Sequence, residues 1–132
     1  MNRLASIVIY VPGNAKEILD FYVAAFDLKL KHYDESFDFG ELDTGETTIA
    51  VANHSAGKFM VGDGYEQEAD GFPKNTELAF IADDVGMAYS MAVKNGCIGL
   101  CPPKDMPWGQ TVAYVKSIEG TLVGLLSKTP AT

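Results

Sequence analysis

The sequence contains the same succession of patterns twice, and this internal repetition limits the folds open to the chain more than any other feature. Residues 6–11, Ser-Ile-Val-Ile-Tyr-Val, are rich in the β-branched and aromatic residues typical of a strand. A Pro-Gly-Asn turn follows, and its Asn14 can cap a helix. Ile18, Tyr22, Ala25 and Phe26 then recur at helical spacing. Three further strands are predicted at residues 28–30, 37–43 and 47–52.

The second half repeats this order with different residues. Residues 77–82 form the next predicted strand, and Asp83-Asp84 can cap the helix that follows. Apolar residues recur at helical spacing from Val85 to Ala92, and Asn95-Gly96 is a helix-ending pair. The last three predicted strands cover residues 97–100, 110–115 and 121–127. Each half is therefore predicted to be a βαβββ module.

The chain length of 132 residues fits a single domain built from both modules. We place module 1 at about 1–55, a connecting loop at about 56–75 and module 2 at about 76–128. The loop contains Phe59, Met60, Tyr65 and Phe72, so we favour an ordered lid or linker over disorder. The expected fold is α+β: two βαβββ modules form a curved mixed sheet around a cavity, with the helices outside. Such a cavity is the default place for a small-molecule ligand.

Composition restricts the possible partners. The net charge of −8 disfavours nucleic acid, because phosphate contacts require Lys and Arg. It also provides no basic patch for an anionic membrane. The start of the chain does not have the pattern of a signal peptide, and no apolar run is long enough for a membrane span. Cys97 and Cys101 lack the partners of a zinc pattern, so we expect free thiols in a reducing, cytoplasmic compartment.

Several segments resemble the glyoxalase / bleomycin-resistance / extradiol-dioxygenase superfamily, also called the vicinal oxygen chelate superfamily. Residues 9–14 followed by 21–28 (FYVAAFDL) are similar to its opening strand and helix, and residues 41–45 to its third strand and turn. Residues 108–115 and 119–123 are similar to its closing hairpin. The order and spacing of these motifs are specific to the superfamily but not to one reaction.

The resemblance implies where a divalent metal would lie in the enzymes of the superfamily. Their ligands, typically His or Gln and Glu, come from the first and last strands of each half. These positions fall here near Ser6, Ala50, Glu77 and Gly124. Alanine and glycine have no donor, serine is a poor ligand for these metals, and Glu77 alone could coordinate. Since a catalytic site needs about three protein ligands, we expect no metal and no other cofactor.

The remaining candidates are aromatic, acidic or histidine side chains. Glu77 is the best catalytic candidate, as a general base or as an anchor for a cationic ligand, although it could equally be an exposed strand residue. His54, after the fourth predicted strand, could lie at the cavity rim or be an ordinary loop histidine. Trp108 could stack on a ligand or close the end of the sheet. Together with the four metal-ligand positions, the ligand-binding candidates are Tyr10, Phe37, His54, Trp108 and Tyr114.

These observations favour a metal-independent small-molecule binding protein that sequesters a neutral or cationic, aromatic ligand. The alternative is a glyoxalase or dioxygenase type of enzyme, a lyase or oxygenase that uses a divalent metal. A third possibility is an interaction module with a vestigial cavity. The resemblance also implies a homodimer.

Overall fold

The computed structural model describes residues 1, 4–67 and 76–128. The chain forms two compact units, residues 1–71 and 72–132. The units correspond to the two repeats of the sequence. Among the described residues, no helix is long and apolar enough to cross a membrane.

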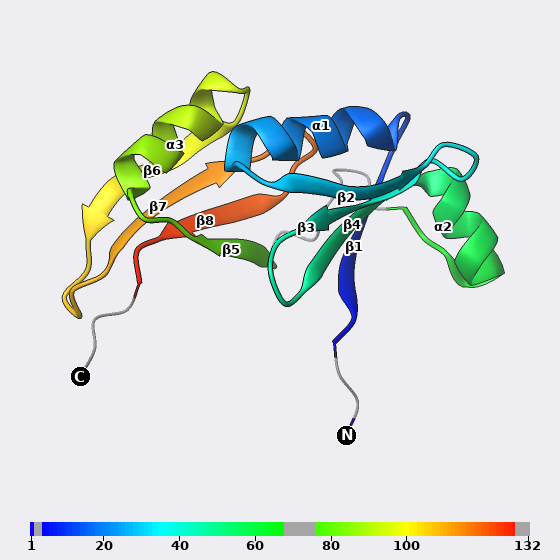
Figure 1. Ribbon diagram of the computed structural model, residues 1–132, viewed down its shortest axis with the longest axis horizontal. Coiled ribbons are helices and arrows are strands. Elements are labelled where there is room, and N and C mark those ends of the chain that lie inside the picture. Colours follow the sequence, from blue (N-terminus) through cyan, green and yellow to red (C-terminus); the bar gives the residue numbers. More distant parts are fainter. Residues whose placement is uncertain (2–3, 68–75, 129–132) are drawn as a thin grey trace. The chain divides into compact units, whose positions relative to one another are not determined.

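The first unit is a βαβββ module followed by two short helices (Figure 1). Its sheet has the strand order β1-β4-β3-β2, with β1 parallel to β4 and the other neighbours antiparallel. The elements in chain order are β1 (Ser6–Val11), α1 (Ala15–Phe26), β2 (Lys29–Asp34), β3 (Phe39–Asp43), β4 (Thr48–Asn53), α2 (His54–Val61) and the 3₁₀ helix η1 (Gly62–Gly64).

Helix α1 lies along one face of this sheet (Figure 1). It begins where the Asn14 side chain accepts hydrogen bonds from the Lys16 and Glu17 N–H groups, and it buries Leu19 and Tyr22 completely. Gly40 of β3 permits the close approach, because a Cβ there would collide with Leu19. Burial of these apolar groups is the main force that holds the helix on the sheet.

The second unit repeats the architecture without the additional helices. Its sheet has the order β5-β8-β7-β6, with β5 parallel to β8, and α3 lies along one face. The Asp84 side chain caps α3 by accepting a hydrogen bond from the Met87 N–H. The elements are β5 (Glu77–Ile81), α3 (Val85–Lys94), β6 (Ile98–Asp105), β7 (Thr111–Lys116) and β8 (Leu122–Leu126).

The two modules also share strand register. Ala50 lies opposite Val8 and Glu41 in the first sheet. Gly124 lies opposite Ala79 and Tyr114 in the second. One irregularity also matches, because the pairing of each edge strand, β2 or β6, shifts just before the residue opposite Glu41 or Tyr114; β6 has a second shift, between Cys101 and Lys104. The predicted α+β class and the two βαβββ modules are confirmed, and the strands are hydrogen-bonded as two four-stranded sheets.

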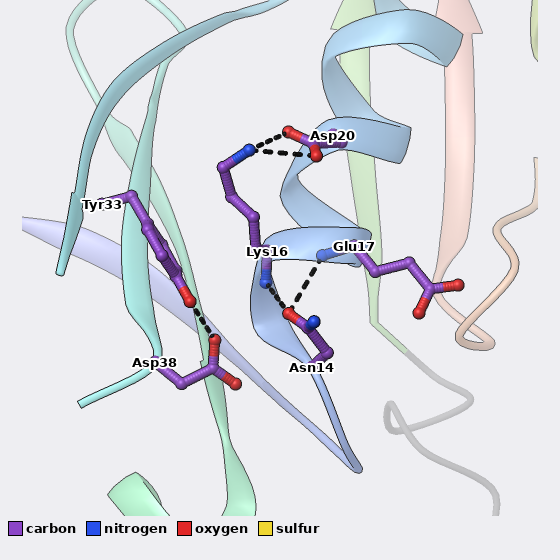
Figure 2. A network of polar contacts seen from close by, with 6 residues as sticks. All are labelled: Asn14, Lys16, Glu17, Asp20, Tyr33 and Asp38. Carbon is purple, nitrogen blue, oxygen red and sulfur yellow. Dashed lines mark hydrogen bonds and ion pairs between the residues drawn. The ribbon is translucent and has the colours of Figure 1, made fainter. Parts of the chain in front are cut away.

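A polar network around Asp38 connects three elements of the first module. The Asp38 carboxylate accepts hydrogen bonds from the Tyr33 hydroxyl (2.6 Å), the Ala15 N–H (2.8 Å) and the Asn53 amide (3.1 Å). Figure 2 shows Tyr33 and Asp38 beside the first turn of α1, where Lys16 pairs with Asp20. The hydrogen bond to Asp38 is the main reason why the pKa of Tyr33 rises to about 12. The network therefore fixes the start of α1 relative to β2 and to the end of β4.

The structure corrects several predicted boundaries. Part of the predicted connecting loop is helical, since α2 and η1 occupy residues 54–64, while residues 68–75 lie outside the described part. His54 is therefore the first residue of a helix and not a loop histidine. Phe37 lies in the turn before β3 and not in the strand. Strand β6 continues through Pro102 and Pro103, which an edge strand tolerates.

Candidate functional site

Each sheet has a face turned away from its helix, and most of the predicted site residues lie on these two faces. In the first module the buried Ile9, Val11 and Val51 mark the α1 side, so the alternate residues lie on the other face. We call this the first distal face; it consists of Ser6, Val8, Tyr10, Phe39, Glu41, Thr48, Ala50 and Ala52. The equivalent second distal face consists of Glu77, Ala79, Ile81, Val112, Tyr114, Lys116, Leu122, Gly124 and Leu126.

On the second distal face, three candidates come together. Gly124 lies between Ala79 and Tyr114 in the sheet. The carboxylate of Glu77 lies over Gly124, where a Cβ would collide with its Oε2 atom and would lie 3.1 Å from the Tyr114 ring. The missing side chain of Gly124 thus leaves room for an exposed carboxylate beside an aromatic ring. This arrangement suits a cation or a hydrogen-bond donor on an aromatic ligand.

At one end of the first distal face, Tyr10 of β1 and His54 of α2 are connected through Tyr65. The Tyr10 and Tyr65 rings pack edge to face, with centroids 5.3 Å apart. The Tyr65 hydroxyl lies 2.5 Å from Nδ1 of His54, and its ring lies against Gly57 of α2. Burial and the neighbouring Tyr10 raise the pKa of Tyr65, so its phenol keeps the proton at neutral pH. The result is a half-buried polar and aromatic cluster where β1 and β4 end.

The four metal-ligand positions implied by the resemblance form equivalent pairs. Ser6 and Glu77 begin β1 and β5, while Ala50 and Gly124 occupy the same register position in β4 and β8. A methyl group and a hydrogen atom at the second pair offer nothing to a metal. Within each module, the described residues contain no group of three His, Cys, Asp or Glu side chains that could hold a metal ion. The donor set therefore does not fit a catalytic divalent metal.

The other predicted candidates lie apart from these clusters. Trp108 is exposed in the turn between β6 and β7, at the opposite end of its sheet from Glu77, and donates a hydrogen bond to Gln110 (2.9 Å). Phe37 is also exposed and packs against Phe59 of α2, with ring centroids 5.8 Å apart. The sequence did not indicate which candidates would be neighbours, because strand register decides this.

Two residues on or beside the first distal face were not selected from the sequence. Tyr65 was assigned only to the connecting loop, and Glu41 only to a strand. The alternation of Glu41 with the buried Leu42 was the available signal for its position on a sheet face. Tyr65 had no such signal, because no periodic pattern surrounds it.

Both cysteines are free, as expected. Burial raises the pKa of the Cys97 thiol to about 11, which makes it a poor nucleophile at neutral pH. Cys97 is therefore a packing residue of the second module.

An α+β chain of two βαβββ modules, each with a distal face that carries polar and aromatic side chains, defines a class with many solved members. No model of a known protein family matches the sequence. No curated protein sequence matches either. Solved structures do match over almost the whole chain, and they give the fold a name.

Three of these structures illustrate the similarity. A glyoxalase-related enzyme from Fulvimarina pelagi has 15% identity and a TM-score of 0.80, with 97% of this chain and 89% of that chain covered. A glyoxalase/bleomycin resistance protein/dioxygenase family enzyme from Burkholderia phytofirmans PsJN has 20% identity and a TM-score of 0.73, with 96% and 98% covered. TioX from Micromonospora sp. ML1 has 19% identity and a TM-score of 0.70, also with 96% and 98% covered. The chain therefore has the fold of the glyoxalase/bleomycin resistance/dioxygenase superfamily, as its sequence predicted.

Proposed function

We propose that this protein is a metal-independent small-molecule binding protein that sequesters a neutral or cationic, aromatic ligand on its distal faces. The observation that carries the proposal is the position of Glu77. Its carboxylate fills the space over Gly124, which is where the resemblance would place a metal-binding carboxylate on β8. A single carboxylate beside the Tyr114 ring suits an organic cation or donor better than a divalent metal, which needs several ligands.

Charge supports the same ligand class. The chain carries 18 acidic and 10 basic residues, so the long-range field favours cations over anions. Glu41 adds a half-buried carboxylate to the first distal face, next to Ala50 in the sheet. The carboxylates of Glu41 and Glu77 would repel an anionic ligand, while Lys116 is the basic side chain among the sheet residues of the second distal face.

Equilibrium dialysis against Ni²⁺ or Zn²⁺, followed by elemental analysis, tests the metal-independent part of the proposal. We expect less than one tightly held ion per chain. A stoichiometric ion that Glu77→Gln removes would overturn the proposal in favour of a metal enzyme. The Glu46→Gln variant, at an exposed turn position of the other module, is the matched control.

The alternative, a glyoxalase or dioxygenase type of enzyme, predicts turnover with added metal. The methylglyoxal–glutathione hemithioacetal is the convenient substrate for this assay. We expect no turnover with Ni²⁺ or Zn²⁺ above that of the metal alone.

A further inference from the structure

The Tyr65 side chain is held in place by three contacts although it follows a short 3₁₀ helix. Its ring lies against Gly57, where a Cβ would be 2.5 Å from the nearest ring atom. Its edge-to-face contact with Tyr10 places it at the end of the first distal face. Its hydroxyl is fixed by His54 at 2.5 Å. A side chain fixed in this way is preorganised for recognition, since little conformational freedom remains to be lost on binding.

The chemistry of the His54–Tyr65 pair determines what the hydroxyl can offer to a ligand. In the arrangement in which the phenol donates its only proton to the imidazole, Nδ1 of His54 accepts and Nε2 carries the ring proton. The phenol oxygen then has lone pairs left but no free proton. It can accept a hydrogen bond and cannot donate one.

We propose that Tyr65, oriented by His54, is a specificity-determining residue that selects an aromatic ligand carrying a hydrogen-bond donor. The ligand ring stacks on the half-exposed Tyr10–Tyr65 pair, and its amino, ring N–H or hydroxyl group donates to the Tyr65 oxygen. This inference rests on the proposed function and makes it more specific. Tyr65 supplies the acceptor, while His54 acts as a positioning residue.

Two planar cationic dyes separate this hydrogen bond from stacking and charge. Proflavine carries two amino donors, whereas N-methylacridinium has a similar ring and charge but no N–H donor. We expect the wild-type protein to bind proflavine more tightly. In Tyr65→Phe, which keeps the ring on Gly57, the affinity for proflavine should fall about tenfold, while that for N-methylacridinium should change less than twofold. Fluorescence titration measures both affinities.

Tyr33→Phe is the matched control, because Tyr33 also has a hydrogen-bonded hydroxyl but lies on the α1 side of the sheet. It should leave both affinities unchanged. In the wild-type protein, the imidazole ¹⁵N shifts should show an unprotonated Nδ1 in His54, and Tyr65→Phe should change them. A protonated Nδ1 in the neutral imidazole would contradict the assigned donor.

The outcomes distinguish this inference from the proposed function. Proflavine binding that Tyr65→Phe leaves unchanged overturns the role of Tyr65 and retains the proposed function. Wild-type protein that binds neither dye overturns both the role of Tyr65 and the proposed ligand class. If Tyr65→Phe fails to fold, Gly57→Ala provides a second route, because its Cβ would displace the ring and should reduce the preference for proflavine.

Discussion

A single glycine determines how Glu77 is placed on the second distal face. Because Gly124 has no side chain, the Glu77 carboxylate can lie over β8 beside Tyr114. We expect Glu77→Gln to weaken the binding of a cationic aromatic dye to the second distal face about tenfold and to reduce the salt dependence of that binding, since a charge-assisted interaction is lost. Fluorescence titration at two ionic strengths measures this change. Equal weakening in the Glu46→Gln control would mean that only the overall charge matters.

Gly57 allows a residue-scale test of the Tyr65 contact. In a helix, Gly→Ala normally stabilises by about 1 kcal/mol, but here the new Cβ would meet the Tyr65 ring. We therefore expect Gly57→Ala to destabilise the wild-type protein and to stabilise the Tyr65→Ala variant by about 1 kcal/mol. Urea unfolding of the four proteins of this double-mutant cycle gives the free energies. The same sign in both backgrounds would show that Tyr65 does not lie on Gly57.

The sequence supplied the individual site residues better than their arrangement. Glu77, Tyr114 and Gly124 were each selected as ligand candidates, and the structure brings them together. Tyr65 was missed because its position depends on contacts with Gly57 and His54 and not on any periodic pattern. Trp108 lies at the opposite end of the sheet from Glu77 because of the strand register. The register could not be inferred from the identity of either residue alone.

At the scale of elements, most strands and both long helices were predictable because strand and helix periods differ. Helix α2 was not, since its residues His-Ser-Ala-Gly-Lys-Phe-Met-Val contain a glycine and form no clear apolar stripe. Its start depends instead on Asn53, whose side chain accepts from the Ala56 N–H (2.8 Å) and donates to Asp38. The capping residue Asn53 was present in the sequence, but it is also the last residue of β4.

Asn53 should therefore contribute to stability through both of its hydrogen bonds. We expect Asn53→Ala to lower the free energy of unfolding by about 1–2 kcal/mol, as measured by urea unfolding. Asn53→Ser can still cap α2 but cannot donate an amide hydrogen bond to Asp38, so it should lower the free energy of unfolding by less than Asn53→Ala does. Unchanged stability in Asn53→Ala would contradict this role.

The Tyr33–Asp38 hydrogen bond predicts an alkaline dependence of stability. The folded-state pKa of Tyr33, about 12, lies above the ordinary value of 10.0, so the folded state holds the proton more tightly. The contribution of this hydrogen bond to the free energy of unfolding is complete below pH 10 and is lost as the pH rises from 10 towards 12. Asp38→Asn should lower this pKa towards 10.0, as followed by phenolate absorbance. The Tyr33→Phe variant lacks this phenol, so comparison with it identifies the part of the phenolate absorbance that comes from Tyr33. An identical titration in the wild-type and Asp38→Asn proteins would refute the prediction.

At the scale of the whole molecule, we propose that the chain forms a homodimer, as its resemblance implies. Sedimentation velocity at micromolar concentration tests this, with a mass of two chains as the expected result. A monomer at every concentration would contradict it. The proposed function does not depend on the outcome, since the Glu77–Tyr114 and His54–Tyr65 clusters each lie within one module.

The matched shifts in the pairing of β2 and β6 have a consequence for aggregation. Both strands are sheet edges, and a register shift in an edge strand disturbs the row of backbone groups that another chain would need for pairing. Strand β6 adds Pro102 and Pro103, and β2 adds Lys29 and Lys31. The strands at the opposite edges, β1 and β5, contain fewer charged residues, and they pair with their neighbours without register shifts. Partly unfolded chains are therefore expected to begin aggregating through β1 and β5, and a lysine introduced near the middle of β1 should slow that process.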